Sequence, residues 1–243
     1  MNKSDNRIML DDGNIELLKW IAVCLMVVDH LNKYLLNGNY PVMFSLGRLA
    51  LPLFVFVLAY NLAREGVYER GGYLRAITRM LIAGVVATPV FVGLDGNLAL
   101  KDGEQEWRWV GNILFTLALL TFCLYCFERA KSKNYWYWVG WVCFWVLGTF
   151  VEYWWAALGL GVAVWLYYKE GSSSPVLLVF SLFLLLVINQ GNWWFMLAFP
   201  VIYGVSKMKV SIPRMKLFFY FFYPLHLMII WGIKHYPLWS GQL

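Results

Sequence analysis

Charged residues are scarce in this sequence. Asp, Glu, Lys and Arg make up 14% of its 243 residues, whereas hydrophobic residues make up 61%. A soluble domain carries about a quarter charged residues, so the composition excludes an ordinary soluble protein. Leu, Val and Phe instead fill runs long enough to cross a lipid bilayer. The 14 Trp, 15 Tyr and 17 Phe residues fit the same class, because aromatic rings collect at membrane interfaces.

Potential metal ligands are also few. The four cysteines all fall inside apolar runs, and Cys123 and Cys126 form a C-x2-C pair with no second ligand pair near it. We therefore expect no metal site, because structural zinc requires four such ligands, and we interpret the cysteines as small apolar residues. A cleavable signal peptide is not expected either. Acidic residues near Asp11 precede the first apolar run, and that run is too long for a signal peptide.

The net charge of +6 raises the alternative of a nucleic-acid partner. The Lys and Arg residues cluster between the apolar runs, however, which is where membrane topology places them. We therefore expect no nucleic acid among the partners and interpret the basic residues as flanking membrane spans.

Nine apolar runs are candidates for membrane spans, each of which requires about 20 apolar residues. The fifth to eighth runs are short, which leaves tilted or re-entrant segments, and counts of eight or ten, open. No internal repeat or soluble domain is visible, so we predict an all-α fold, a polytopic transmembrane helical bundle that forms one integral membrane domain over residues 1–243. The nine runs cover residues 15–36, 44–63, 73–93, 109–127, 135–150, 153–168, 175–189, 193–206 and 216–234.

The loop charges predict the orientation of these spans. When loops are assigned to alternate sides, fifteen Lys and Arg residues share the side of the N-terminus and five lie on the other. Positive residues concentrate in cytoplasmic loops, so we predict a cytoplasmic N-terminus and, with nine spans, an extracytoplasmic C-terminus. The acidic stretch from Gly93 to Arg108 then becomes the main extracytoplasmic loop.

Polar residues inside spans are costly and usually serve a function. The candidates are Asp29, His30, Asn61, Asn112, Glu152 and His226. Adjacent residues do not share a face of a helix, so an Asp29–His30 dyad within one helix is not expected. We therefore expect a group from another helix, Glu152 or a tyrosine, to orient His30. The alternative is a neutral histidine that only packs between helices.

Two further patterns concern charge and aromatic residues. Lys216, Tyr220 and Tyr223 share a helix face in the last span, where Pro224 can kink the helix; a lipid-facing aromatic stripe is the alternative. A cytoplasmic basic opening is predicted from five residues: Arg64, Arg70, Arg75, Arg79 and Lys216. Guanidinium groups suit phosphate oxygens, although these residues also fit a plain topology signal.

With these residues in view, the chain resembles the TraX family of conjugal pilin acetylases. The Asp-His pair, the Arg-Leu-Ala-Leu-Pro run and the Tyr-Pro-x-His-Leu ending are specific in combination. The matching stretches extend from the first span to the last: residues 18–30 (LKWIAVCLMVVDH), 47–54 (GRLALPLF), 111–115 (GNILF), Glu152-Tyr153 with Gly159, and 218–227 (FFYFFYPLHL).

The resemblance implies an enzyme of the bacterial inner membrane that uses acetyl-coenzyme A to acetylate the N-terminal amine of pilin. The chain is more distantly similar to the acyltransferase-3 family, whose first helix carries an arginine, then ten residues, then a histidine; here Lys19 takes the place of the arginine and precedes His30 by the same spacing. A different extracytoplasmic acceptor such as a glycan, a transporter with an ion relay, and a pilus assembly factor are the alternatives.

The expected site combines these features. His30 is the expected general base, about 22 Å from the cytoplasmic end of its span and past the midplane of a ~30 Å core. Asn112, Arg48 or Tyr223 is expected to stabilise the oxyanion, and both direct transfer and an acetyl-histidine intermediate are open. The expected catalytic residues are His30, Asp29, Glu152 and Asn112, and the expected residues for the acetyl-coenzyme A donor are Arg48, Asn61, Arg64, Arg75, Arg79, Lys216, Tyr220, Tyr223 and His226.

Overall fold

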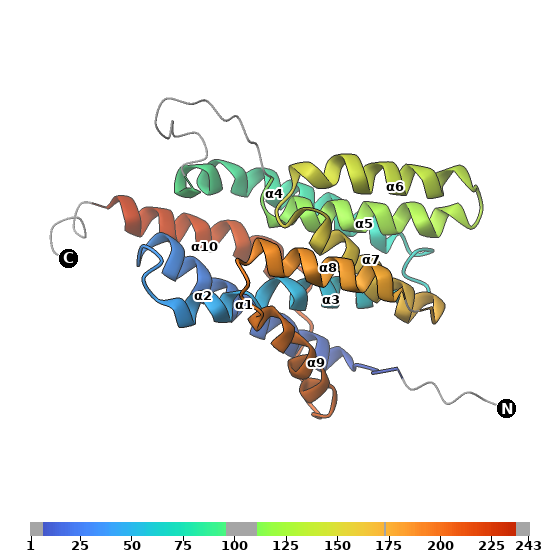
Figure 1. The fold of residues 1–243 in the computed structure, drawn as a ribbon, viewed down its shortest axis with the longest axis horizontal. Coiled ribbons are helices and arrows are strands. Elements are labelled where there is room, and N and C mark those ends of the chain that lie inside the picture. The colour runs from blue at the N-terminus through green and yellow to red at the C-terminus, as the bar shows by residue number, and fades with distance from the viewer. Residues whose placement is uncertain (1–6, 96–110, 173, 237–243) are drawn as a thin grey trace.

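The described part of the chain is helical throughout, as the sequence predicts. The computed structural model describes residues 7–95, 111–172 and 174–236, which form ten α-helices, two short 3-10 helices and one isolated β-bridge (Figure 1). The elements are α1 (Asp12–Tyr34), α2 (Pro41–Gly47), α3 (Ala50–Ala63), α4 (Gly72–Asp95), α5 (Ile113–Ala130), α6 (Tyr135–Leu147), η1 (Gly148–Phe150), α7 (Trp154–Glu170), α8 (Pro175–Ile188), η2 (Trp194–Leu197), α9 (Ala198–Ser206) and α10 (Phe218–His235).

Each of the nine predicted spans contains a helix, but their lengths differ. Three helical segments, Pro41–Ala63, Gly72–Leu94 and Ile113–Ala130, are long and apolar enough to cross a membrane, whereas the apolar helices Pro175–Ile188 and Trp194–Ser206 are shorter. The chain is therefore a membrane protein by composition and helix length. The total of nine crossings stays a prediction.

The first helix begins far from the point where the last helix ends. In Figure 1 the end of α10 lies at the left of the long axis, whereas the start of α1 lies to the right of its middle. The cytoplasmic position of the N-terminus stays a prediction, and most of the predicted outer loop, residues 96–110, lies outside the described residues.

Helix α7 forms the centre of the main hydrophobic core. Ala156, Ala157 and Leu158 are fully buried in it, and α7 packs against α3, α5 and α8. Gly159 faces Ser181 of α8, and Gly161 faces Leu120 of α5, so closely that a side chain at either glycine would overlap its neighbour. Small residues allow helices in a membrane to approach in this way.

The segment that precedes α5 pairs with the segment that precedes α7 and forms a short irregular corner. The backbone of Gly111 pairs with the segment at Val151, accepting from the Glu152 N–H and donating to the Phe150 carbonyl. Tyr153 and Trp154, which follow, both adopt positive φ angles of 58° and 46°. Such backbone conformations are strained for residues other than glycine and often occur at functional sites.

Candidate functional site

A single large cavity collects most of the predicted site residues. It has a volume of about 1180 Å³ and is bordered by α1, α3, α4 and α10 and by the segment that precedes α10. Ten of the thirteen predicted residues line it: Asp29, His30, Asn61, Arg64, Arg75, Arg79, Glu152, Lys216, Tyr220 and Tyr223. The remaining three, Arg48, Asn112 and His226, are not among the lining residues.

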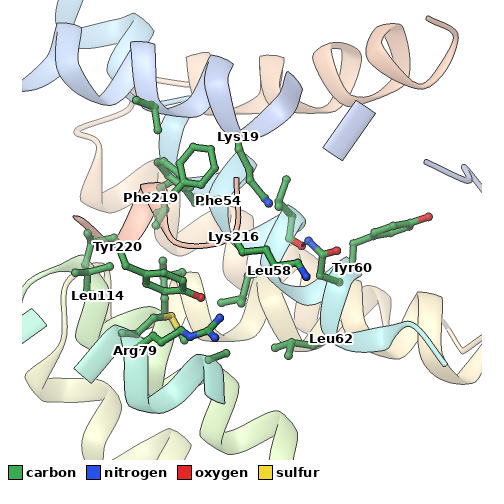
Figure 2. A pocket seen from close by; sticks show the side chains of 18 of the residues that line it. Lys19, Phe54, Leu58, Tyr60, Leu62, Arg79, Leu114, Lys216, Phe219 and Tyr220 are labelled. Carbon is green, nitrogen blue, oxygen red and sulfur yellow. Dashed lines mark hydrogen bonds between the residues drawn. The ribbon is translucent and has the colours of Figure 1, made fainter. Parts of the chain in front are cut away.

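One part of the cavity is strongly cationic. Eight Lys and Arg side chains line the cavity against three Asp and Glu side chains, so an anionic ligand is favoured there. Figure 2 shows the polar ends of Lys19, Lys216, Arg79 and Tyr220 directed into one space, although these residues come from α1, α4 and α10 and the segment before it. Lys216 itself precedes α10, which begins at Phe218 and not at residue 216 as predicted.

Ion pairs neutralise only some of these cations. Arg64 contacts Asp12 at 2.6 Å, and this hydrogen bond holds the pKa of the Asp12 carboxyl below its usual value. Lys19 contacts Glu16 at 2.6 Å. Within the described part of the chain, Arg79 and Lys216 have no carboxylate partner. They are therefore available to an anionic ligand.

His30 lies in the same cavity and pairs with a second histidine. Its Nδ1 atom lies 2.7 Å from Nε2 of His226, and Nδ1 of His226 lies 3.1 Å from the carbonyl oxygen of Phe222. A group from another helix does contact His30, as predicted, and its hydrogen-bond partner is His226, which was not among the predicted candidates. Tyr34 and Tyr223 also contact the ring of His30, with centroids 5.6 and 6.5 Å away.

The histidines and the cations are separated along both helices. Lys19 and His30 are eleven residues apart in α1, which corresponds to about 16 Å. Tyr220 and His226 are six residues apart in α10, or about 9 Å. The cavity therefore has a cationic region and, about two to three helical turns away from it, a region with an imidazole.

Asp29 contacts the cavity but is bound to Arg48. Their side chains are 2.5 Å apart, and Arg48 also donates to Asn189 and to the carbonyl of Phe44. Asp29 is thus not the partner of His30, as predicted from helix geometry. The contacts of Arg48 hold α1, α2 and the end of α8 together, and Arg48 also interacts with Tyr153, which lines the cavity. Its expected donor-binding or oxyanion role stays a prediction.

Asn112 has a structural task as well. Its side-chain oxygen accepts from the backbone N–H of Leu114 and so caps α5, while its nitrogen donates to the Gly84 carbonyl. With 1% of its surface exposed, it connects α5 to α4. Both its amide atoms have hydrogen-bond partners and Asn112 does not line the cavity, so its expected role at the oxyanion stays a prediction.

Two other lining residues carry features that the sequence did not reveal. Asn61 donates to the Val57 carbonyl one turn earlier, which leaves its side-chain oxygen buried and without a partner among the described residues. Tyr153 lines the cavity beside Glu152, on the strained corner before α7. Tyr153 belongs to a stretch that carries the family resemblance, but its backbone angle and its hydrogen bond with Arg48 depend on the fold and were not predicted.

Comparisons with known proteins identify the family of the chain. The family model described as TraX protein matches residues 14–234. The chain is similar to Protein TraX of Escherichia coli, with 32% identity over 115 residues. This alignment covers 46% of the chain and 40% of the relative, so the chain matches less than half the length of that relative. No solved structure gives a significant match. Since the family model covers nearly the whole chain, the protein belongs to the TraX family.

Proposed function

We propose that this protein is a membrane-bound acetyltransferase that moves an acetyl group from acetyl-coenzyme A to the N-terminal amine of a pilin-like membrane subunit. One observation carries the proposal. A single cavity joins an imidazole, His30, to a cluster of cations that includes Arg79 and Lys216, which have no carboxylate partner among the described residues. Acetyl-coenzyme A has the matching form, because a long flexible arm separates its phosphates from its thioester.

The donor would lie along the length of the cavity. Arg79 and Lys216, with Arg64 and Arg75 nearby, hold the phosphates by charge-assisted hydrogen bonds. The arm then extends between Tyr220 and Asn61 toward His30. The unsatisfied oxygen of Asn61 suits an amide N–H, of which the arm has two.

The chemistry is an acyl transfer. The amine nitrogen attacks the carbonyl carbon of the thioester, the carbon–sulfur bond breaks, and coenzyme A leaves as a thiolate. His30 takes the proton that the amine loses and passes it to the thiolate. Of the three residues expected to stabilise the oxyanion, Tyr223 is the one that lines the cavity, near His30, and we assign to it the hydrogen bond to the oxyanion.

An amine is a better acceptor than a sugar hydroxyl for this site. An α-amino group has a pKa of about 7.7–8.0, so a useful fraction is neutral near pH 7 and a single imidazole suffices as base. A pilin-like subunit embedded in the bilayer would reach the site by packing between helices. This proposal places the enzyme in the bacterial inner membrane as a multi-pass protein linked to conjugation.

The acceptor is tested by mass spectrometry. The candidate pilin is co-expressed with the wild-type enzyme or with the His30→Ala variant, and its N-terminal peptide is analysed. We expect the mass increment of one acetyl group on the first residue with wild-type enzyme only. An unmodified pilin beside an acetylated surface glycan would contradict the amine acceptor, and no acetylated product of any kind would favour a transporter or an assembly factor.

A further inference from the structure

The two histidines lie edge to edge. Their ring centroids are 5.0 Å apart with planes 6° apart, and the nearest nitrogens are 2.7 Å apart. Stacked rings would keep their atoms about 3.5 Å apart or more, so the contact is an in-plane hydrogen bond. The ring of Phe222 lies parallel to the ring of His226, with planes 7° apart and centroids 5.3 Å apart, which fixes the plane of His226.

The chain of hydrogen bonds determines where the protons lie. The Phe222 carbonyl can only accept, so Nδ1 of His226 carries a proton and donates it. In a neutral imidazole the other nitrogen is then an acceptor. Nε2 of His226 therefore accepts from Nδ1–H of His30. His30 is left with its proton on Nδ1 and a lone pair on Nε2.

We propose that His226 is a positioning residue that holds His30 in the tautomer whose Nε2 atom is the base. This inference rests on the proposed acetyl transfer and gives His226 a different task from the donor binding expected from the sequence. His226 is suited to it, because it is only 6% exposed and does not line the cavity, whereas His30 does. The Phe222 carbonyl in turn fixes the tautomer of His226.

The hydrogen bond also contributes during the reaction. When Nε2 of His30 takes the proton of the attacking amine, the ring becomes an imidazolium and its Nδ1–H becomes a stronger donor to His226. The proton on Nδ1 does not move. The proton on Nε2 then passes to the coenzyme A thiolate, which returns His30 to its starting tautomer.

The kinetic test compares three variants with labelled acetyl-coenzyme A and acceptor. His226→Leu removes the acceptor of the hydrogen bond, and we expect kcat to fall on the order of 10- to 100-fold, as when a metal-binding histidine loses the partner that orients it. His226→Gln supplies a carbonyl oxygen that can accept from His30 and should recover part of kcat. The control is His235→Gln, since His235 is exposed at the end of α10 and, among the described residues, bonds to Trp231 of its own helix.

The KM for acetyl-coenzyme A separates positioning from binding. We expect it to stay within about twofold of wild type in His226→Leu, since a change in kcat alone marks an interaction used in the transition state. A rise in KM with unchanged kcat would overturn the proposal and favour donor binding by His226. A His226→Leu enzyme with wild-type kcat would overturn it as well.

A spectroscopic test does not depend on turnover or on the folding of a variant. The chain has only three histidines, so nitrogen NMR of wild-type protein labelled at histidine can resolve each ring. We expect His30 and His226 both protonated at Nδ1 and bare at Nε2. A proton on Nε2 of His30 would overturn the proposal, even if acetyl transfer is observed. If no acetyl transfer is observed but the tautomer is as expected, the proposed function fails while the hydrogen-bond chain stands.

Discussion

Asp29 and His30 are neighbours in the chain but have different partners. Successive residues of a helix point about 100° apart, so Asp29 faces Arg48 of the α2–α3 break while His30 faces His226 of α10. The partly buried carboxylate of Asp29 is thereby neutralised by a guanidinium, as a charge at membrane depth requires. The imidazole keeps one nitrogen for chemistry.

The cations of the cavity differ in their partners. Lys19 and Arg64 each contact a carboxylate, whereas among the described residues Arg79 and Lys216 contact none. We predict that Arg79→Gln or Lys216→Gln weakens coenzyme A binding by about 1–3 kcal/mol each, the range for a hydrogen bond to a charged group. Calorimetric titration of the purified protein with coenzyme A measures this. Lys133→Gln is the control, because Lys133 is exposed and does not line the cavity. Unchanged affinity for coenzyme A in both variants would contradict donor binding and leave the basic residues with a role in membrane topology alone.

At the scale of helices, the close packing of α2 against α1 positions the site. Gly47 ends α2 against Asp29 of α1, and a side-chain carbon at Gly47 would overlap the carboxyl group of Asp29. Helix α2 is therefore able to place Arg48 on Asp29 only because residue 47 has no side chain. The α1–α10 contact is formed partly by rings, with Trp20 against Phe218 and Phe219.

The close approach of Gly47 to Asp29 predicts the effect of a single methyl group at residue 47. Gly47→Ala should destabilise the protein by about 1–3 kcal/mol, the usual cost of overpacking, and should lower the thermal midpoint in detergent. Gly204→Ala in α9 is the matched control, because nothing lies within 4 Å of the added carbon and alanine favours a helix. Equal midpoints for the two variants would show that Asp29 and Arg48 can separate at no cost.

Particular elements show what the sequence was able to predict. Apolar runs separated by charged loops indicated each helical segment, because burial in lipid acts on composition over about 20 residues. The histidine pair escaped prediction, since it joins residues 196 positions apart and depends on how α1 and α10 pack. The Arg48–Asn189 contact was not predicted for the same reason. The capping role of Asn112 is local, and an Asn just before an apolar run is a helix-start signal that the sequence does carry. Charge placement, by contrast, indicated the cavity residues from α3 and α4.

At the scale of the whole molecule, the charge distribution and the helical ends indicate one orientation. We predict a cytoplasmic N-terminus and an extracytoplasmic C-terminus, because fifteen of the 20 Lys and Arg residues fall on the N-terminal side. Reporter fusions at both ends measure this. Both ends on one side would remove the nine-span arrangement and the outer position of His30, which lies eighteen residues, or about 27 Å, beyond the start of α1.

The central claim is that His30 is the base of an acetyl transfer, and one assay tests it most directly. Purified wild-type protein and His30→Ala are given labelled acetyl-coenzyme A and the amine acceptor, with His235→Ala as the control. We predict that His30→Ala loses on the order of 10²–10⁴ in rate while coenzyme A binding persists and His235→Ala stays active. An acetyl-histidine intermediate would also label wild-type protein without acceptor. Near wild-type turnover by His30→Ala would contradict the account.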